Sequence, residues 1–63
     1  MEKYNSISIH YYSSQTDICL FFANDEGGFE GERLWLEMPD TETAERVYDC
    51  LCKANPNLIQ YSA

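Results

Sequence analysis

Apolar and polar residues alternate along the first part of the chain, from Tyr4 to Tyr12. Ile7, Ile9 and Tyr11 fall on one side of an extended segment, and serines and a histidine lie between them. A period of two, with residue types that favour strands, predicts a β-strand. The polar residues 13–16 that follow predict a hairpin loop.

A second strand is predicted from Ile18 to Ala23, where every residue is apolar. A strand that is apolar on both faces is typical of one covered on both sides. We therefore place this strand at the centre of the sheet and expect something to cover its second face. With a four-residue loop before it, Tyr12 would pair with Asp17, and Ile9 would lie opposite Leu20.

The segment from Asn24 to Gly31 contains all three glycines and predicts the turn into a third strand. Alternation resumes from Glu32 to Met38, with the leucines facing the core and Trp35 facing away. A two-residue turn would put the leucines on the wrong side, because a slip of one residue reverses every side chain. We therefore expect an odd-length loop or a bulge at Gly31.

The residues after Pro39 have the period of an amphipathic helix. Asp40 or Thr41 can cap its start, and Asn55-Pro56 stops it. Its apolar stripe consists of Ala44, Val47, Tyr48 and Leu51. Two i,i+4 ion pairs are expected on the opposite face, namely Glu42–Arg46 and Asp49–Lys53.

Residues 1–63 therefore predict one small α+β domain, with a three-stranded antiparallel sheet in β-β-β-α order packed on one C-terminal helix. The segment 57–63 contains Leu58, Ile59 and Tyr61. It leaves two options open: a short fourth strand, or a segment that lies over the helix end. A chain of this size buries only about 60 % of its unfolded surface, so a deep pocket is not expected.

The charge of the chain is concentrated in one stretch. The formal net charge is −7, and residues 25–49 hold nine of the eleven acidic residues and two arginines. This segment alone therefore sums to −7, while residues 1–24 sum to −1 and residues 50–63 to +1. Polarised charge attracts partners of opposite sign and repels those of like sign. Bare nucleic acid and anionic membranes are thus excluded, and a basic protein surface is favoured.

Two surfaces are candidates for partner binding. The first is acidic and consists of Asp25, Glu26, Glu30, Glu32, Glu37, Asp40, Glu42, Glu45 and Asp49. If the loop and the polar helix face lie on one side, these carboxylates could imitate the phosphates of a duplex; otherwise they form a solvated surface. The second candidate is the sheet face away from the helix, which would expose Phe21 and Trp35. That face is either covered by the C-terminal tail or by a second copy, or it is a hot spot for another protein.

No catalytic or metal motif is present, and we expect neither an enzyme nor a cofactor. The loop 24–32 lacks the ligand spacing of a calcium loop. Cys50 and Cys52 point apart on a helix and cannot share a metal there. His10 has no identifiable orienting acid. The odd number of cysteines, with no signal peptide and no apolar run of membrane-spanning length, indicates a protein of the reducing cytoplasm.

In size, acidity and compactness, the chain resembles the small inhibitors that bacteriophages encode against host restriction, CRISPR or polymerase machinery. The resemblance is one of type and no motif carries it. It implies an inhibitor that occupies a basic, nucleic-acid-binding surface of a host protein in the host cytoplasm, for example as a DNA mimic. Two alternatives stay open: an antitoxin or immunity-type partner, and a homodimeric assembly protein joined through the aromatic sheet face.

Overall fold

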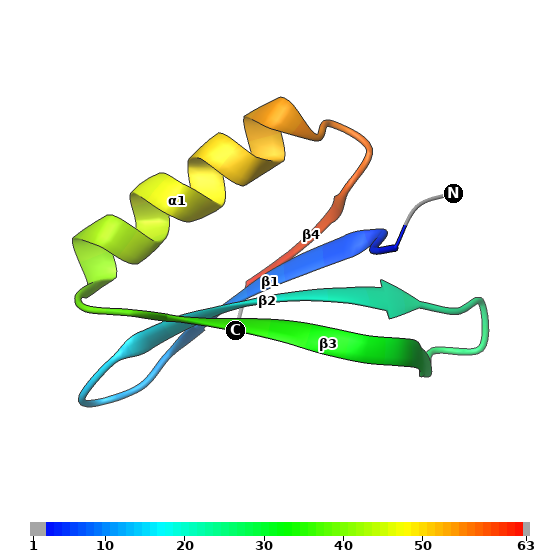
Figure 1. Cartoon of the computed structure of the whole chain (residues 1–63), viewed down its shortest axis with the longest axis horizontal. Helices are drawn as coiled ribbons and strands as arrows, with labels where there is room; N and C mark the ends of the chain where they lie inside the picture. The colour runs from blue at the N-terminus through cyan, green and yellow to red at the C-terminus, as the bar shows by residue number, and fades with distance from the viewer. Residues whose placement is uncertain (1–2, 63) are drawn as a thin grey trace.

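The computed structural model describes residues 3–62 and has four strands and one helix (Figure 1). The elements in chain order are β1 Ser6–Tyr11, β2 Thr16–Ala23, β3 Phe29–Met38, α1 Thr41–Ala54 and β4 Ile59–Ser62. The strands form one mixed sheet in the order β3-β2-β1-β4. The predicted α+β class and the β-β-β-α order are confirmed.

The hairpin between β1 and β2 is tighter than the sequence suggested. Tyr11 pairs with Thr16 and Ile9 with Ile18, so the predicted pairing of Tyr12 with Asp17 is wrong by two residues. The Tyr12 N–H donates to the Gln15 carbonyl over 2.9 Å, which closes a two-residue turn. A shift of two residues keeps every side chain on its face, so the predicted faces hold although the register does not.

The connection between β2 and β3 confirms the expectation of an odd-length loop and also shows an irregularity at Gly31. Ala23 pairs with Phe29 across a five-residue loop, so β3 begins three residues earlier than predicted. Gly31 has a φ of +72°, a left-handed conformation that glycine adopts readily. The register shifts beside it, between Leu20 and Phe22. Because the loop has an odd number of residues, the leucines of β3 lie on the sheet face that packs against the helix.

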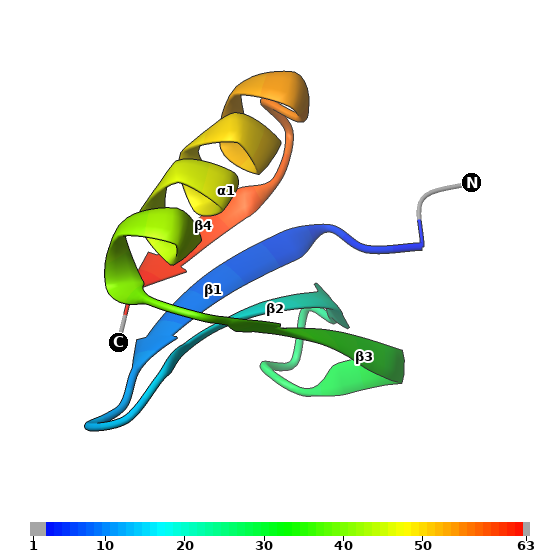
Figure 2. The same cartoon turned by 60° about the vertical axis from the view of Figure 1, so that its left-hand side comes forward.

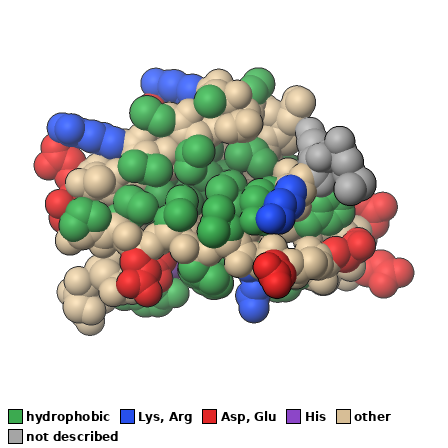
Figure 3. Space-filling view, viewed as in Figure 1, with side chains coloured by type: hydrophobic (Ala, Val, Ile, Leu, Met, Phe, Trp, Pro, Cys, Tyr) green, Lys and Arg blue, Asp and Glu red, His purple; other side chains and the backbone are tan. Residues whose placement is uncertain are grey.

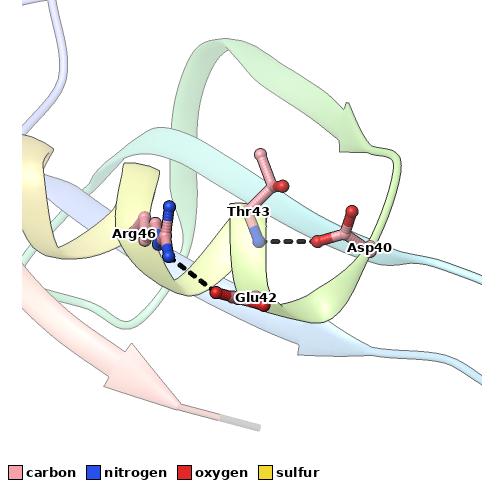
Figure 4. Close-up of polar contacts among 4 residues, drawn as sticks. All are labelled: Asp40, Glu42, Thr43 and Arg46. Carbon is pink, nitrogen blue, oxygen red and sulfur yellow. Dashed lines mark hydrogen bonds and ion pairs between the residues drawn. The ribbon is translucent and has the colours of Figure 1, made fainter.

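The helix starts and stops where the sequence placed it (Figure 4). The Asp40 carboxylate accepts a 2.7 Å hydrogen bond from the Thr43 N–H, which satisfies one of the free donors of the first turn. Asn55 ends the helix, and its N–H donates to the Leu51 carbonyl over 3.0 Å. Both predicted ion pairs form: Arg46 to Glu42 over 2.6 Å and Lys53 to Asp49 over 2.9 Å. Exposed pairs of this kind add only about 0.3–0.5 kcal/mol each.

The core lies between α1 and one face of the sheet, and Figure 2 shows the helix crossing that face. Its buried members are few: Ile7, Ile9, Ile18, Ala44 and Cys52. Seven partly buried residues surround them: Leu20, Leu36, Met38, Val47, Tyr48, Leu51 and Leu58. The three remaining members of the predicted helix stripe are thus only half-buried, and the core is small even for a chain of this length.

The C-terminal segment forms a fourth strand, which settles the alternative left open by the sequence. β4 runs parallel to β1, with Ser6 opposite Ile59 and Ser8 opposite Tyr61. The Ile59 N–H donates to the Asn5 carbonyl over 2.9 Å. Ala63, the last residue of the predicted segment, lies outside the described residues. Because β4 joins β1 rather than β3, the long strand β3 stays at an edge of the sheet.

Candidate functional site on the aromatic face of the sheet

The sheet face opposite α1 collects aromatic side chains from all four strands. We call it the aromatic face. The register aligns Tyr61, Ser8, Cys19 and Trp35 in one row across β4, β1, β2 and β3. The face consists of Ser8, His10, Cys19, Phe21, Phe29, Arg33, Trp35 and Tyr61, with Tyr12 beyond its end. Its two edge strands contribute its most exposed rings.

Ring contacts tie the aromatic face together. Phe21 lies at the centre, with Phe29 edge-on at a centroid distance of 5.2 Å and Tyr61 tilted at 5.8 Å. His10 lies 5.2 Å from Trp35, and its Nε2 is 2.7 Å from the Ser8 hydroxyl oxygen. These separations fall in the range where aromatic pairs attract one another beyond their buried area. The rings therefore form a preorganised surface.

Exposure separates two groups of rings on this face. Phe21 is only 7 % exposed, so it does not lie open on a bare sheet, and its contact with Tyr61 agrees with the alternative of cover by the C-terminal tail. Phe29 and Tyr61 pack against Phe21. They supply the covering layer that we expected over the second face of the all-apolar strand β2. Trp35, Tyr61 and Phe29 are themselves 43 %, 46 % and 57 % exposed. The partner-accessible part of the face is thus its outer ring of aromatics, with Phe21 as their support.

The aromatic face is concave. It encloses an open hollow of about 360 Å³, lined mainly by apolar atoms. Asn24 and Gly27 of the β2–β3 loop line one end of it. A second hollow, of about 410 Å³, lies at the C-terminal end of α1 between Leu20, Leu51 and Leu58. Because those leucines belong to the margin of the core, we assign the second hollow to incomplete packing.

Charged groups frame the aromatic face at its ends. At one end, the exposed Glu37 of β3 lies directly opposite Asp17 of β2, which is buried and accepts a 2.9 Å hydrogen bond from Gln15 Nε2. At the other end, Asp25 and Glu26 belong to the loop that lines the hollow. Between them, the Arg33 guanidinium lies 5.2 Å from the centre of the Phe29 ring, a cation–π arrangement. The face therefore has an apolar centre and a mostly acidic rim.

The thiol on this face is not a nucleophile. Cys19 is buried beneath the rings. Burial raises the pKa of the Cys19 thiol, and the Arg33 guanidinium and the Ser8 hydroxyl offset only part of that increase. Thiols react as thiolates, so a raised pKa keeps this sulfur inert near neutral pH. Cys19 serves as a small apolar residue.

The structure does not gather the nine predicted acidic residues into one patch. Asp25 and Glu26 lie in the β2–β3 loop, at the opposite end of the molecule from the start of α1 (Figure 1). Figure 3 shows acidic side chains at both ends and along the lower edge, with apolar side chains between α1 and β3. The strand β3 carries Glu30, Glu32 and Glu37. The helix and its cap carry Asp40, Glu42, Glu45 and Asp49.

The carboxylates of α1 lie on the other side of the sheet from the aromatic face, and each makes an intramolecular contact. Glu42 and Asp49 form the two ion pairs, and Asp40 caps the helix. Glu45 accepts a 3.0 Å hydrogen bond from the Tyr11 hydroxyl. One flat partner surface therefore cannot contact both the helix carboxylates and Trp35.

Sequence reasoning missed Phe29, Arg33 and Tyr61 as members of the site. Phe29 was assigned to the loop and Arg33 to the exposed alternation of β3. A signal for Phe29 was present, because a five-residue loop after Ala23 puts Phe29 on the same face as Phe21. Tyr61 offered no such signal, since its position depends on the pairing of β4 with β1.

Metal-ligand clusters and membrane-spanning helices are both absent from the part of the chain that the structure describes. Among residues 3–62, no three His, Cys, Asp or Glu side chains come together as metal ligands. Within the same residues, no helix has the length and apolarity needed to cross a membrane. Comparison with protein-family models, curated proteins and solved structures found no match to this chain.

Proposed function

We propose that this chain is a small binding protein whose aromatic face docks on a basic surface of a nucleic-acid-handling protein and blocks it. The observation that carries the proposal is the partial exposure of Trp35, Tyr61 and Phe29 on one concave sheet face. Trp and Tyr dominate protein–protein hot spots, which cluster at the centre of an interface. An exposed aromatic patch on so small a protein marks a contact surface.

The rim indicates the charge of the partner. Specific interfaces combine an apolar centre with a polar rim. Here the exposed Glu37 lies at one end of the face, and at the other end the loop whose Asn24 and Gly27 line the hollow carries the exposed Asp25 and Glu26. A partner with Lys and Arg around an apolar recess would complement it. Single-stranded nucleic acid also stacks on aromatic sheets, but it requires a basic groove, and a chain of net charge −7 would repel it.

The remaining carboxylates have a separate role in this proposal. Those of α1 lie away from the aromatic face and add to the long-range field of the molecule. Such a field raises the rate of encounter with a basic partner without forming contacts. The proposal thus relies on aromatic contacts with an acidic rim rather than on a continuous row of carboxylates that imitates a duplex.

Basic protein surfaces of this kind occur on enzymes that hold nucleic acid, so the proposed activity is inhibition by occupancy, without catalysis. The size and charge suit a phage-type inhibitor of host restriction, CRISPR or polymerase machinery. We place its action in a reducing cytoplasm, in keeping with three cysteines that are all free thiols.

A pull-down from host lysate with two matched variants tests the proposal. The aromatic variant carries Phe29→Ala and Trp35→Ala. The helix variant carries Glu42→Lys, Glu45→Lys and Asp49→Lys, and it serves as the control because those residues lie on the other side of the sheet. We expect the helix variant to capture the same basic protein as the wild type but more weakly, because its net charge falls from −7 to −1, and the aromatic variant to lose it. The captured protein should release its nucleic acid when the purified wild type is added.

Three results would contradict the proposal. Capture that survives the aromatic substitutions but not the helix substitutions would assign binding to the helix carboxylates. Capture of its own kind alone would point to a homodimer. A captured protein that keeps its nucleic acid when saturated with this chain would exclude inhibition by occupancy. Circular dichroism of each variant verifies that the fold is retained.

A further inference from the structure

β3 is an edge strand, and its backbone is available to another strand. The order β3-β2-β1-β4 leaves one side of β3 without a neighbour among residues 3–62. Two loop-closing hydrogen bonds show how the ladder alternates: Tyr12 N–H to the Gln15 carbonyl and Asn24 N–H to the Gly28 carbonyl, each 2.9 Å. Gln15 therefore directs its carbonyl toward β1, and Asn24 directs its N–H toward β3. Because these directions alternate along an antiparallel strand, the odd-numbered residues of β2 direct their N–H and C=O toward β1, and the even-numbered residues direct theirs toward β3.

The free backbone groups of β3 can be identified from this alternation. Ile18 pairs with Leu36 and Leu20 with Leu34, so these two leucines of β3 bond to β2. Trp35 therefore directs its N–H and C=O to the open edge. By the same alternation, Arg33 and Glu37 also direct their N–H and C=O to the open edge. A row of unpaired donors and acceptors of this kind is a template for strand addition.

We propose that β3 pairs antiparallel with β3 of a second copy, in the register centred on Trp35. In this register Trp35 lies opposite Trp35 of the second copy. Arg33 lies opposite Glu37, and Leu34 lies opposite Leu36. The Arg33–Glu37 and Leu34–Leu36 pairs each occur twice, because a two-fold interface is reciprocal, whereas the Trp35 pair lies on the axis and occurs once. The result is one continuous sheet of two copies, with both helices on one face and both aromatic faces on the other.

Charge complementarity selects this register. Arg33 and Glu37 lie two residues on either side of Trp35, on the same face of the strand. Among residues 3–62, the ion pairs are those of Arg46 and Lys53, so Arg33 and Glu37 are both available. A register centred on Leu34 would place Arg33 opposite Trp35, and one centred on Leu36 would place Glu37 there. Only the register centred on Trp35 pairs the two charges, and opposite charges directly across strands stabilise a sheet.

The apolar side of β3 fits the same arrangement. Leu34 is 41 % exposed on the helix side of the sheet, and Leu36 is partly buried. Figure 3 shows apolar side chains gathered in view between α1 and β3. In the proposed pairing, the four leucines of two copies would meet between the two helices. A chain with so small a core gains from a second copy, since small scaffolds often need an added constraint.

Strand pairing uses the backbone edge of β3, and it brings the Trp35 and Glu37 side chains, which also belong to the aromatic face and its frame, to the seam between the two copies. Charge reversal at Arg33 and Glu37 tests it by sedimentation velocity over a dilution series. The wild type is expected to be a dimer that dissociates on dilution. Arg33→Glu and Glu37→Arg should each raise the dimer dissociation constant by roughly tenfold to a hundredfold, because each substitution places like charges opposite each other twice.

Mixing supplies the decisive measurement. The Arg33→Glu and Glu37→Arg chains are expected to restore the dimer when mixed in equal amounts, because one then carries two acids and the other two arginines. The double variant should also dimerise with itself. Glu26→Arg changes the net charge as much as Glu37→Arg but lies in the loop, so it should leave the dissociation constant unchanged.

Three outcomes would overturn the proposed pairing. The wild type could be monomeric at every concentration. Its dimer could be indifferent to both charge reversals. The mixture of the two reversed chains could stay monomeric although each chain retains the circular dichroism of the wild type. Each outcome is read from self-association of the purified chain, whereas the lysate experiment reads the capture of a basic protein.

Discussion

Single side chains complete the ladder of this sheet where the backbone does not. Asn5 precedes β1, and its amide imitates a strand residue: Nδ2 donates to the Ala23 carbonyl over 2.9 Å, and Oδ1 accepts from the Ala23 N–H over 2.8 Å. Its own backbone accepts from Ile59 of β4. One residue therefore links the ends of β1, β2 and β4.

Replacement of Asn5 should cost more than its position near the end of the chain suggests. Asn5→Ala removes both bonds to Ala23 and should lower the free energy of unfolding by about 1–3 kcal/mol, measured by urea denaturation. Asn57→Ala is the control, because that exposed side chain makes no hydrogen bond within the described residues. Equal losses in the two variants would show that the Asn5 amide contributes nothing to the sheet.

Gly31 is the second residue with an effect beyond its size. Its φ of +72° is disfavoured for residues with a Cβ, although a Cβ added there would meet no atom within 4 Å. Gly31→Ala should therefore destabilise the protein by roughly 1–2 kcal/mol through backbone conformation alone. Gly31→Asn should cost less, because Asn tolerates this region better than Ala. Thermal or urea unfolding distinguishes the two, and an Ala variant as stable as the wild type would contradict the assigned conformation.

At the scale of elements, the helix is the part with a testable pH dependence. The backbone N–H of Thr43, and then the Thr43 side chain, lower the pKa of the Asp40 carboxyl from its usual value of 3.8. A carboxyl with a depressed pKa stabilises the folded state above its unfolded pKa, and this contribution is lost as the pH falls through the folded value. Asp40→Ala should thus be less stable than the wild type at neutral pH, and the difference should shrink below about pH 4.

Urea denaturation at neutral and acid pH measures this difference. Asp40→Asn provides the control, because its amide oxygen can still accept from Thr43 but does not titrate. Its stability relative to Asp40→Ala should be the same at both pH values. A wild-type advantage that persists unchanged in acid would show that the charge of Asp40 does not contribute to the cap.

The elements also show which parts of the fold a sequence specifies locally. The cap at Asp40, the apolar stripe and the stop at Asn55 all act within a few residues, so the helix could be predicted with its ends. The faces of β1 followed from alternation, whereas those of β2 followed from its pairing with β1 and those of β3 from alternation together with an odd-length loop. The β1–β2 register could not be obtained, because Ser13 and Ser14 form the turn by themselves and their polar neighbours look equally suited to a loop. The partner of β4 depends on contacts more than fifty residues apart in the chain.

The same limit explains the candidate site. Trp35 could be placed on the open face because its own strand alternates. The burial of Phe21 could not be predicted, because its cover comes from Phe29 after an irregular loop and from Tyr61 on the most distant strand. The separation of the carboxylates into different parts of the molecule could not be predicted either. The sequence gives the number of carboxylates but not their positions in the folded structure.

At the scale of the whole molecule, salt should distinguish the two proposed associations. Attraction between a chain of charge −7 and a basic partner is screened by ions, whereas two copies of charge −7 repel each other at long range. Raising the salt from about 50 mM to about 300 mM should weaken partner capture by about tenfold or more, while the dimer should weaken much less, because screening of the repulsion between the two copies offsets screening of the Arg33–Glu37 pairs. Sedimentation velocity and a binding titration in the same buffers measure both. Parallel weakening of the two would contradict the strand-pairing model.

The position of Trp35 has an optical consequence. It is the only tryptophan of the chain and lies on the open sheet face, 5.2 Å from the His10 ring. Its emission therefore reports from a single place and needs no added label. A partner protein that binds the aromatic face and displaces water from it would shift the Trp35 emission to shorter wavelength. Pairing of two β3 strands would instead bring two indoles close enough for their excited states to couple, which gives a paired band in the circular dichroism. One native chromophore can thus tell the two associations apart in unmodified protein.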